Sequence, residues 1–298
     1  MERISLHSEG PELSRIVAGA WRWKLEPGQV ESLVNAALDQ GITSFDHADI
    51  YGDYSNEQIF GEVLRNNPSL REDIELITKC GIQLTSEKMP QNRVKHYDSS
   101  LKHIQQQVER SLQNLNTDRI DLLLIHRPDP LLNPLEVAEA FARLKEQGKV
   151  LHFGVSNFTP HQYDMLQAYL PFPLVTNQIE LSLFHNAPLT DGSLDHLMQH
   201  KIKPMVWSPL GGGVHFGSEG NLAGPFLDAI EMLSEKYNGA TTAQLLIAWL
   251  LRLPATVVPV IGTTKPERMA EAVEALSIEL DRQDWFELWR IERGRDID

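Results

Sequence analysis

The sequence predicts an α/β protein with one domain over residues 1–298, folded as a single (β/α)8 TIM barrel. Three observations support this fold class. Short β-branched or aliphatic runs alternate with longer amphipathic patterns along the whole chain, which is typical of parallel strands joined by helices. The 298 residues suffice for such a barrel, which needs about 250. No Pro/Ser-rich linker or shift of composition marks a second domain.

Eight runs of this kind are predicted to be strands, and each is followed by a predicted helix. The strands are expected at residues 16–18, 43–45, 74–78, 120–125, 151–155, 174–177, 203–207 and 256–260. The helices are expected near residues 29–40, 56–65, 98–114, 134–147, 160–169, 192–201, 241–252 and 266–276. Eight strand–helix units in succession favour a closed parallel barrel over an open sheet.

Three of the expected helices carry a helix-start signal. Ser55, Thr159 and Thr264 each stand three residues before a Gln or a Glu, which is the spacing of a capping box. Pro160 adds a proline at the first helical position of the second of these helices. Each signal lies at the head of a helix that follows a predicted strand.

Two connections are longer than the loops that usually join barrel elements. They cover residues 80–97, after the third strand, and residues 211–225, after the seventh. Both leave the carboxyl ends of strands, the face at which barrel enzymes place their active sites. They are predicted to shape such a site, and the alternative is that they are tolerated surface insertions.

Composition restricts the partners and the location of the chain. The formal net charge of −14 argues against nucleic-acid and anionic-membrane partners. The one cysteine, Cys80, excludes an intrachain disulfide and a CxxC metal or redox site, and no metal site of another kind is predicted. Neither a secretory signal nor a membrane-spanning apolar run is found. A cytoplasmic location is therefore expected, and a monomer is expected because no helix has an exposed apolar stripe.

Three consecutive predicted strands finish in polar residues that suit proton transfer. Asp46, Lys79 and His126 stand at the ends of the second, third and fourth strands, and Tyr51 follows Asp46 by five residues. In a barrel these positions converge on one mouth. Any one of them alone has an ordinary structural explanation, such as an ion pair or a core histidine, but four at one end point to an active site.

The four residues have a shared chemical logic. Tyrosine, with a usual pKa of about 10, is a poor acid at neutral pH, and a nearby lysine ammonium is expected to lower that pKa. An aspartate beside the lysine holds the ammonium charged and in place. Histidine can donate a hydrogen bond to a carbonyl oxygen and polarise it. The set therefore suits general acid catalysis on a carbonyl group.

The motifs DHADIYG (46–52), ITK (77–79), LLLIHRPD (122–129) and GVSNF (154–158) occur in this order along the chain. With them the chain resembles the aldo-keto reductase superfamily and, within it, the bacterial YdhF-like oxidoreductases. The resemblance runs from Gly19 to the helix after Gly262. It implies a catalytic tetrad in which Tyr51 is the acid, Lys79 adjusts its pKa, Asp46 orients Lys79, and His126 orients the carbonyl.

The resemblance also implies an NADPH or NADP cofactor that lies across the barrel mouth. The absence of a G-x-G-x-x-G motif agrees with this, because no dinucleotide-binding domain is then expected. Ser156, Asn157 and Gln178 are expected to bind the carboxamide, and Trp207 to stack on the nicotinamide ring. The pyrophosphate is expected along Ser208, Pro209, Leu210, Gly211 and Gly212. Further cofactor contacts are expected at Gly19, Ala20, Trp21, Asp46, Ile261, Gly262, Thr263, Thr264, Glu271 and Ala272.

Arg268 matches the family position that holds the adenosine 2′-phosphate, a bidentate role that suits arginine and selects NADPH over NADH. The chain departs from the pattern nearby: Gly262 stands where many members have a basic residue, and Ala272 where asparagine is common. Lys265 is close enough in sequence to compensate. A solvated helix charge is the alternative explanation of Arg268.

The substrate is expected to be a small carbonyl compound bound at a mouth formed by Trp21, Trp23, Tyr54, Arg127 and the two long loops. Arg127 either contacts a polar or anionic substrate or pairs with Asp129. The predicted reaction is hydride transfer to an aldehyde or ketone, with Tyr51 protonating the oxygen. Two alternatives stay open: an NADPH-binding sensor or regulatory subunit with little turnover, and an aldolase or lyase that uses Lys79 as a Schiff base.

Overall fold

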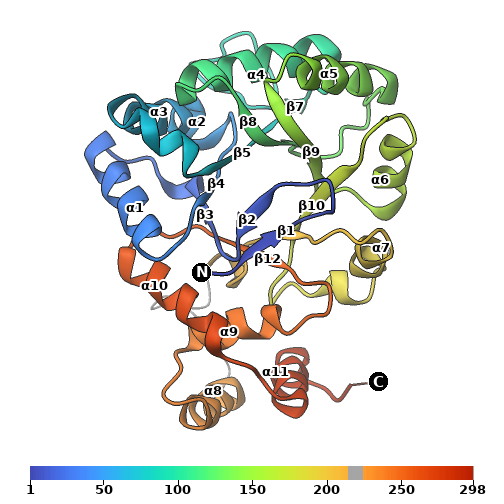
Figure 1. Cartoon of the computed structure of the whole chain (residues 1–298). Helices are drawn as coiled ribbons and strands as arrows, with labels where there is room; N and C mark the ends of the chain where they lie inside the picture. Colours follow the sequence, from blue (N-terminus) through green and yellow to red (C-terminus); the bar gives the residue numbers. More distant parts are fainter. Residues whose placement is uncertain (214–223, 298) are drawn as a thin grey trace.

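The fold is a closed barrel of eight parallel strands, as the sequence predicts (Figure 1). The computed structural model describes residues 1–213 and 224–297. Around the barrel the strands follow the order β10-β11-β12-β3-β4-β5-β8-β9. In chain order they are β3 (Val17–Gly19), β4 (Ser44–Asp46), β5 (Glu75–Cys80), β8 (Ile120–Ile125), β9 (Val150–Ser156), β10 (Leu174–Glu180), β11 (Met205–Trp207) and β12 (Val258–Ile261).

An outer ring of helices covers the barrel, and each helix expected from the sequence is present (Figure 1). These helices are α1 (Pro27–Asp39), α3 (Asn56–Asn66), α4 (Leu101–Leu115), α5 (Pro134–Glu146), α6 (Pro160–Gln167), α7 (Ser193–Gln199), α9 (Thr242–Leu251) and α10 (Pro266–Glu274). Their apolar faces pack on the strands because every buried strand side chain that points outward needs an apolar neighbour. Within residues 1–213 and 224–297, no helix has both the length and the apolar character needed to cross a membrane.

A hairpin that the sequence analysis did not predict covers the amino ends of the barrel strands. It consists of β1 (Arg3–Ser5) and β2 (Glu12–Ser14), which pair antiparallel and lie across the barrel end in Figure 1. Leu6 and Leu13 of the hairpin join an apolar cluster inside the barrel with Ile77, Leu122 and Val258. The amino end of the barrel is therefore filled with apolar side chains, and the opposite end is left for polar ones.

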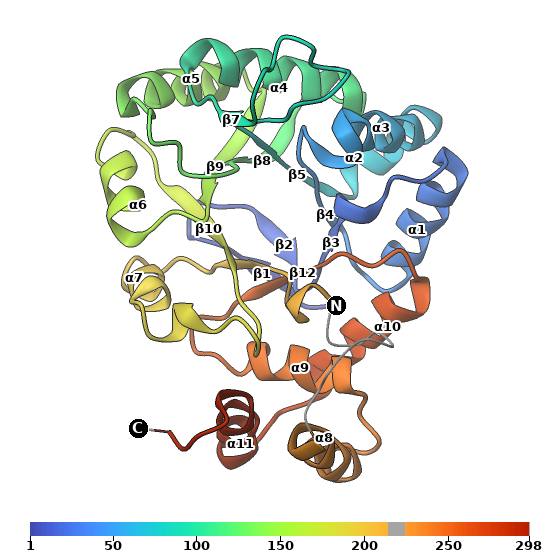
Figure 2. The ribbon, with the colours of Figure 1, turned by 180° about the vertical axis from the view of Figure 1, so that it is seen from behind.

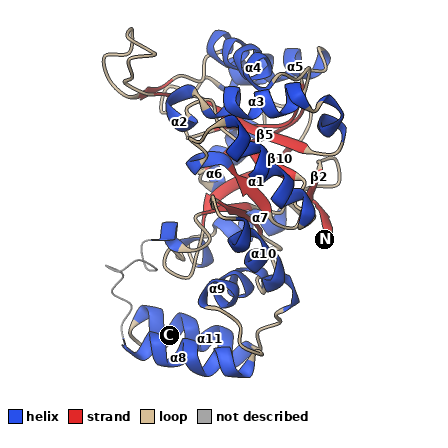
Figure 3. Ribbon diagram, turned by 90° about the vertical axis from the view of Figure 1, so that its left-hand side faces the viewer, coloured by secondary structure: helices blue, strands red, loops and turns tan. Residues whose placement is uncertain are grey.

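Two helices lie outside the predicted ring. They are α8 (Gly224–Lys236) and α11 (Arg282–Arg293), which pack side by side below α9 in Figure 3. Trp249 of α9 stacks on Trp285 of α11 with ring centroids 4.7 Å apart and planes at 3°. This apolar contact holds the added pair of helices against the barrel.

Of the three predicted capping boxes, the one at Thr159 is confirmed. The box at Ser55 is wrong, because the Ser55 hydroxyl donates to the Gly52 carbonyl of the preceding turn instead. The box at Thr264 is wrong too, because α10 begins one residue later, with Lys265 as its N-cap. At Ser55, and at Thr263, whose hydroxyl accepts from the Lys265 N–H, a short polar side chain competes with the helix end for local backbone groups.

The connection over residues 80–97 is an ordered hairpin in which β6 (Ile82–Gln83) pairs with β7 (His96–Tyr97). Figure 2 looks onto the carboxyl ends of the strands, and β7 lies there near α2 (Tyr51–Tyr54). Ile82 and Met89 pack on Tyr51 and Tyr54 in one apolar cluster. This connection therefore supports the residues that follow β4. Most of the second long connection, residues 214–223, lies outside the described residues.

Candidate active site

Asp46, Tyr51, Lys79 and His126 come together at the carboxyl ends of three neighbouring strands. Asp46 is the last residue of β4, Lys79 is next to last in β5, and His126 directly follows β8. The Lys79 ammonium donates hydrogen bonds to Asp46 Oδ2 at 2.6 Å, to the His47 carbonyl at 2.8 Å and to the Tyr51 hydroxyl at 3.0 Å. The site is thus built around one buried lysine.

The charge of Lys79 is fixed by its neighbours. Burial disfavours the ammonium, but the Asp46 carboxylate and the Tyr51 oxygen outweigh this and raise the pKa of Lys79 above its usual value. Burial raises the pKa of Tyr51 as well, and the Lys79 charge opposes that shift without reversing it. The expected net lowering of the tyrosine pKa is therefore not found, and Tyr51 is a protonated phenol at neutral pH.

His126 is a neutral imidazole beside Tyr51. Burial, and then the positive charges of Lys79 and Arg127, lower the pKa of His126 well below its usual value. The Tyr51 and His126 rings have centroids 5.9 Å apart and are nearly perpendicular, at 77°. Neither ring nitrogen of His126 forms a hydrogen bond with a residue that the structure describes. The imidazole is therefore available to donate to an oxygen atom that lies next to the Tyr51 hydroxyl.

A tight turn fixes Tyr51 at the start of α2. The next three residues all have positive φ, with 60° at Gly52, 56° at Asp53 and 62° at Tyr54. A Cβ atom at Gly52 would lie 1.7 Å from the Asn56 side-chain oxygen, so only glycine fits there. The turn stores backbone strain immediately beside the tyrosine, as is common at functional sites.

We therefore expect Gly52→Ala to lower the free energy of unfolding by about 1–3 kcal/mol and to displace Tyr51. Chemical denaturation measures the first effect, and the second reduces catalytic turnover. Gly28→Ala in α1 is the matched control, because nothing lies within 4 Å of a Cβ atom there and its φ is not positive. If both variants were equally stable, Gly52 would not be strained.

A chain of hydrogen bonds links the tetrad to residues on the other side of the barrel. Gln178 Nε2 donates to Asp46 Oδ1 at 2.9 Å, and the Gln178 carbonyl accepts from the Ser156 hydroxyl at 2.9 Å. Asn157 Nδ2 donates to Ser156 Oγ at 2.8 Å, and Trp207 Nε1 donates to Asn157 Oδ1 at 3.0 Å. Four residues expected to bind the nicotinamide half of the cofactor therefore form one connected group with the tetrad.

The segment after β12 has the features of a phosphate site. Ile261 ends β12, Gly262, Thr263 and Thr264 follow it, and α10 begins after Lys265. Among the described residues no side chain caps α10; Pro266 has no N–H and the Arg268 N–H donates to the Lys265 carbonyl, which leaves the Glu267 N–H open to an anion. The Arg268 side chain on the first turn is exposed and forms no ion pair with any described residue. The incorrectly predicted cap at Thr264 thus gives way to a helix start that suits a phosphate.

Other expected cofactor contacts fall into two groups. Gly19, Ala20 and Trp21 leave β3 beside Tyr51, and Ser208 to Gly212 leave β11, with positive φ at Ser208, Gly211 and Gly212. Glu271 and Ala272 lie on α10. The Glu271 carboxylate accepts from the Thr241 hydroxyl at the start of α9, and Ala272 is buried.

Of the four residues expected to line the substrate mouth, two face it. The Trp21 ring is 61% exposed and meets Tyr51 edge-on at 5.5 Å, and the Arg127 guanidinium lies 5.2 Å from the Trp207 ring. Trp23 is buried among core side chains of α3 and β4, and its indole N–H donates to the Thr263 carbonyl. The Tyr54 hydroxyl accepts from the Leu84 N–H, and the residue is buried.

The alternative in which Arg127 pairs with Asp129 is wrong. Asp129 Oδ2 accepts from the Ser99 N–H and hydroxyl, and Oδ1 accepts from the Leu131 N–H, so the carboxylate is used by the segment before α4 and by its own loop. The guanidinium of Arg127 lies against Trp207 instead. A positive charge at the mouth is therefore free to meet a polar substrate.

Three buried ionisable residues beside the tetrad were missed from the sequence. Burial and then the Lys79 charge lower the pKa of His47 to about 3, and burial and then Glu57 raise the pKa of Asp49 well above its usual value. Glu57 accepts hydrogen bonds from Thr78 and Ser111 hydroxyls and is also buried. The sequence feature that could have revealed them is that all three ionisable residues lie within a short segment after β4. Neither Asp49 nor Glu57 accepts a hydrogen bond from Lys79, and the Asp46 carboxylate is the acidic group that holds it.

The comparisons with known proteins agree with this arrangement. The profile of the Aldo/keto reductase family matches residues 15–293. The chain is 47% identical to the uncharacterized oxidoreductase YcsN of Bacillus subtilis over 100% of both chains. It is 46% identical to the oxidoreductase YdhF of Escherichia coli over 100% of this chain and 99% of that one. It is 45% identical to a 6-dehydroglucose reductase of Agrobacterium fabrum over 100% of both.

A solved structure supports the fold. The crystal structure of the thermostable aldo-keto reductase Tm1743 with the inhibitor epalrestat superposes with a TM-score of 0.83, covering 98% of this chain and 100% of that one. Its sequence identity is 24%, so the likeness concerns the barrel itself. Together with the match of the profile over residues 15–293, the similarities to these relatives identify the chain: it belongs to the aldo/keto reductase family of oxidoreductases.

Proposed function

We propose that the protein is an NADP(H)-dependent carbonyl reductase in which Tyr51 protonates the oxygen of an aldehyde or ketone. The observation that carries this proposal is the buried bridge from Asp46 through the Lys79 ammonium to the Tyr51 hydroxyl. That hydroxyl oxygen accepts from Lys79, so its own proton is free to be donated to a substrate. NADP-dependent carbonyl reduction is also typical of the family.

Each residue of the tetrad has its own role in the proposed reaction. NADPH, when bound, supplies a hydride to the carbonyl carbon. The His126 imidazole donates a hydrogen bond to the carbonyl oxygen and orients it beside Tyr51. As negative charge develops on that oxygen, Tyr51 transfers its proton, and the Lys79 ammonium stabilises the phenolate that remains. Asp46 keeps Lys79 charged throughout.

The residues at the mouth fit the cofactor. The amides of Asn157 and Gln178 match a carboxamide, which needs both a donor and an acceptor. The half-buried Trp207 ring offers a face for stacking. The uncapped start of α10 with the exposed Arg268 suits a phosphate. We propose that these residues bind NADPH in preference to NADH, with Arg268 on the 2′-phosphate.

The preference for NADPH is tested by Arg268→Ala. The lost charge-assisted hydrogen bonds are worth roughly 1.5–3 kcal/mol, so the Kd for NADPH should rise about 10- to 100-fold, while the Kd for NADH stays unchanged. Fluorescence titration measures both. Arg282→Ala, which removes an exposed arginine of α11, is the control. An equal loss for both cofactors would contradict a role on the 2′-phosphate.

We further propose that the substrate is a small polyhydroxylated carbonyl compound. A relative that is 45% identical over its full length is named a 6-dehydroglucose reductase. Arg127 and the exposed Trp21 indole at the mouth suit such a substrate, because sugars combine hydroxyl groups with apolar faces. Consumption of NADPH with 6-dehydroglucose, compared with simple aldehydes, ketones and 1,2-dicarbonyls, tests this. A lower kcat/KM for 6-dehydroglucose than for simple aldehydes would contradict it.

The pH dependence follows from the two perturbed groups. The pKa of His126 is far below its usual value and that of Tyr51 is above its usual 10 or so, so neither group titrates in between. We expect kcat/KM for carbonyl reduction to be flat from pH 6 to about 9 and to fall only when Tyr51 loses its proton at higher pH. A break near pH 6.5 in initial rates would show that His126 titrates normally.

We also propose, from the sequence, that the protein is cytoplasmic and monomeric. The buried, free thiol of Cys80 is consistent with a reducing compartment.

A further inference from the structure

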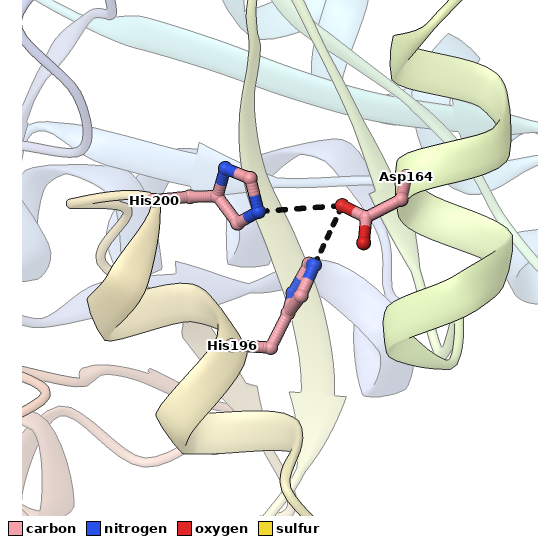
Figure 4. A group of neighbouring side chains, drawn as sticks. All are labelled: Asp164, His196 and His200. Carbon is pink, nitrogen blue, oxygen red and sulfur yellow. Dashed lines mark hydrogen bonds and ion pairs between the residues drawn. The ribbon is translucent and has the colours of Figure 1, made fainter.

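Two neighbouring helices on the outside of the barrel bring three potential metal ligands together, away from the strand ends that hold the tetrad. His196 lies on α7, His200 directly follows α7 as its C-cap residue, and Asp164 lies on α6 (Figure 4). His196 Nε2 is 2.7 Å and His200 Nε2 is 3.3 Å from the same oxygen, Asp164 Oδ1. One nitrogen or oxygen from each residue lies within 4.8 Å of the other two.

We propose that Asp164, His196 and His200 form a zinc site. Zinc bound to two imidazoles and one carboxylate, with water as the fourth ligand, is a common tetrahedral arrangement. Metal–ligand distances of about 2.0–2.1 Å place tetrahedral ligand atoms roughly 3.3 Å apart. The Asp164–His200 separation already has this value, and the Asp164–His196 separation needs to widen by about half an ångström. The Asp164 carboxylate is half exposed and can make that adjustment.

The helix geometry explains why both histidines face one point. Residues four apart on an α-helix lie on the same face, so His196 and His200 project together, with ring centroids 4.5 Å apart. A divalent cation bound to one nitrogen of each ring and to the carboxylate would satisfy all three side chains at once.

The surroundings hold the two rings in place. The Tyr163 hydroxyl donates to the Leu174 carbonyl at 2.5 Å, and this buried ring packs edge-on against His196 at 5.3 Å. His200 lies 6.0 Å from the same ring. The His196 side chain is 11% exposed, so one ligand is largely shielded from water while Asp164 and His200 remain accessible to an entering ion.

A bound zinc ion would clamp α6 to α7. These helices follow β9 and β10, whose carboxyl ends hold Ser156, Asn157 and Gln178. Zinc bound there would stabilise the fold without touching the reacting atoms at the barrel mouth. The proposal is independent of the reductase function, because it uses none of the residues at the barrel mouth.

The test titrates the metal-free full-length protein with ZnCl2 by isothermal calorimetry at pH 7.5, followed by thermal denaturation. We expect one zinc per chain and a rise in Tm of about 5 °C at a hundredfold excess over the Kd. His196→Gln, His200→Gln and Asp164→Asn should each weaken binding by at least 10-fold. Mg²⁺ should give no saturable binding, since it prefers oxygen ligands.

His96→Gln is the matched control, because it removes an exposed histidine of β7 outside the site and should leave zinc binding unchanged. Two outcomes overturn the proposal. In one, no saturable zinc binding is detected up to 100 μM. In the other, the double variant His196→Gln/His200→Gln binds zinc as tightly as the wild type, which would place the metal elsewhere on the chain.

Discussion

Replacing Tyr51 with Phe is expected to lower kcat for carbonyl reduction by about 10²–10⁴-fold and to leave NADPH affinity unchanged. The substitution removes the hydroxyl that we propose as the proton donor and keeps the ring that packs on Trp21 and His126. The measurement is NADPH consumption at saturating substrate, together with a fluorescence titration of NADPH for the same samples.

The two measurements separate the explanations of a loss. Full turnover by Tyr51→Phe would show that another group is the acid. Loss of NADPH binding would show that the hydroxyl acts in the binding of the cofactor instead. Binding by the wild type with no turnover on any carbonyl compound would favour an NADPH-binding sensor. Borohydride trapping of a carbonyl compound on Lys79 would favour Schiff-base chemistry.

Lys79→Met is expected to lower the free energy of unfolding by about 3–5 kcal/mol, which is the cost of leaving a buried partner charge unpaired. Lys79 is 1% exposed and donates to Asp46, His47 and Tyr51. Without it, Asp46 keeps one side-chain donor, from Gln178. Urea denaturation measures the loss as a lower midpoint at an unchanged m-value. Turnover should fall as well, because nothing then stabilises the Tyr51 phenolate.

The double variant Lys79→Met/Asp46→Asn is the control for this prediction. It removes both charges, so it should be more stable than Lys79→Met alone, and together with the single variant Asp46→Asn it gives the coupling energy between the two side chains. If Lys79→Met unfolded at the same urea concentration as the wild type, the Asp46 carboxylate would have to be protonated or hydrated, and the buried ion pair would not support the fold.

The barrel could be predicted from the sequence because its strands are short apolar runs at regular intervals. The hairpin of β1 and β2 was missed because it has three residues in each strand and its apolar residues are interleaved with polar ones. Helix α8 carries a periodic pattern of Phe226, Ile230 and Leu233, which was available to sequence reasoning. The wrong caps at Ser55 and Thr264 show that a spacing alone does not decide which backbone groups a hydroxyl meets.

The tetrad could be predicted because its members stand at strand ends, and the topology of a barrel places those ends together. Their pKa values could not, because burial is set by side chains from many elements. Burial outweighs the Lys79 charge at Tyr51 and reverses the expected direction. Trp23 and Tyr54 were expected at the mouth, but Trp23 packs in the core against β4 and α3, and Tyr54 is buried in the same cluster as Tyr51. The group of Asp164, His196 and His200 joins two helices and was visible only in part, as a His-x3-His spacing.

The hydrogen bond from Gln178 to Asp46 joins β10 to β4, which stand four places apart in a ring of eight strands. It therefore runs across a diameter of the cylinder. If each strand bonded only to the strands beside it, the barrel could flatten to an oval cross-section. A hydrogen bond between opposite strands resists that deformation. The same hydrogen bond restrains the distance between the side of the barrel that carries Lys79 and the side that carries Asn157 and Trp207. The circular cross-section of the barrel therefore sets the distance between the tetrad and the residues expected to bind the nicotinamide.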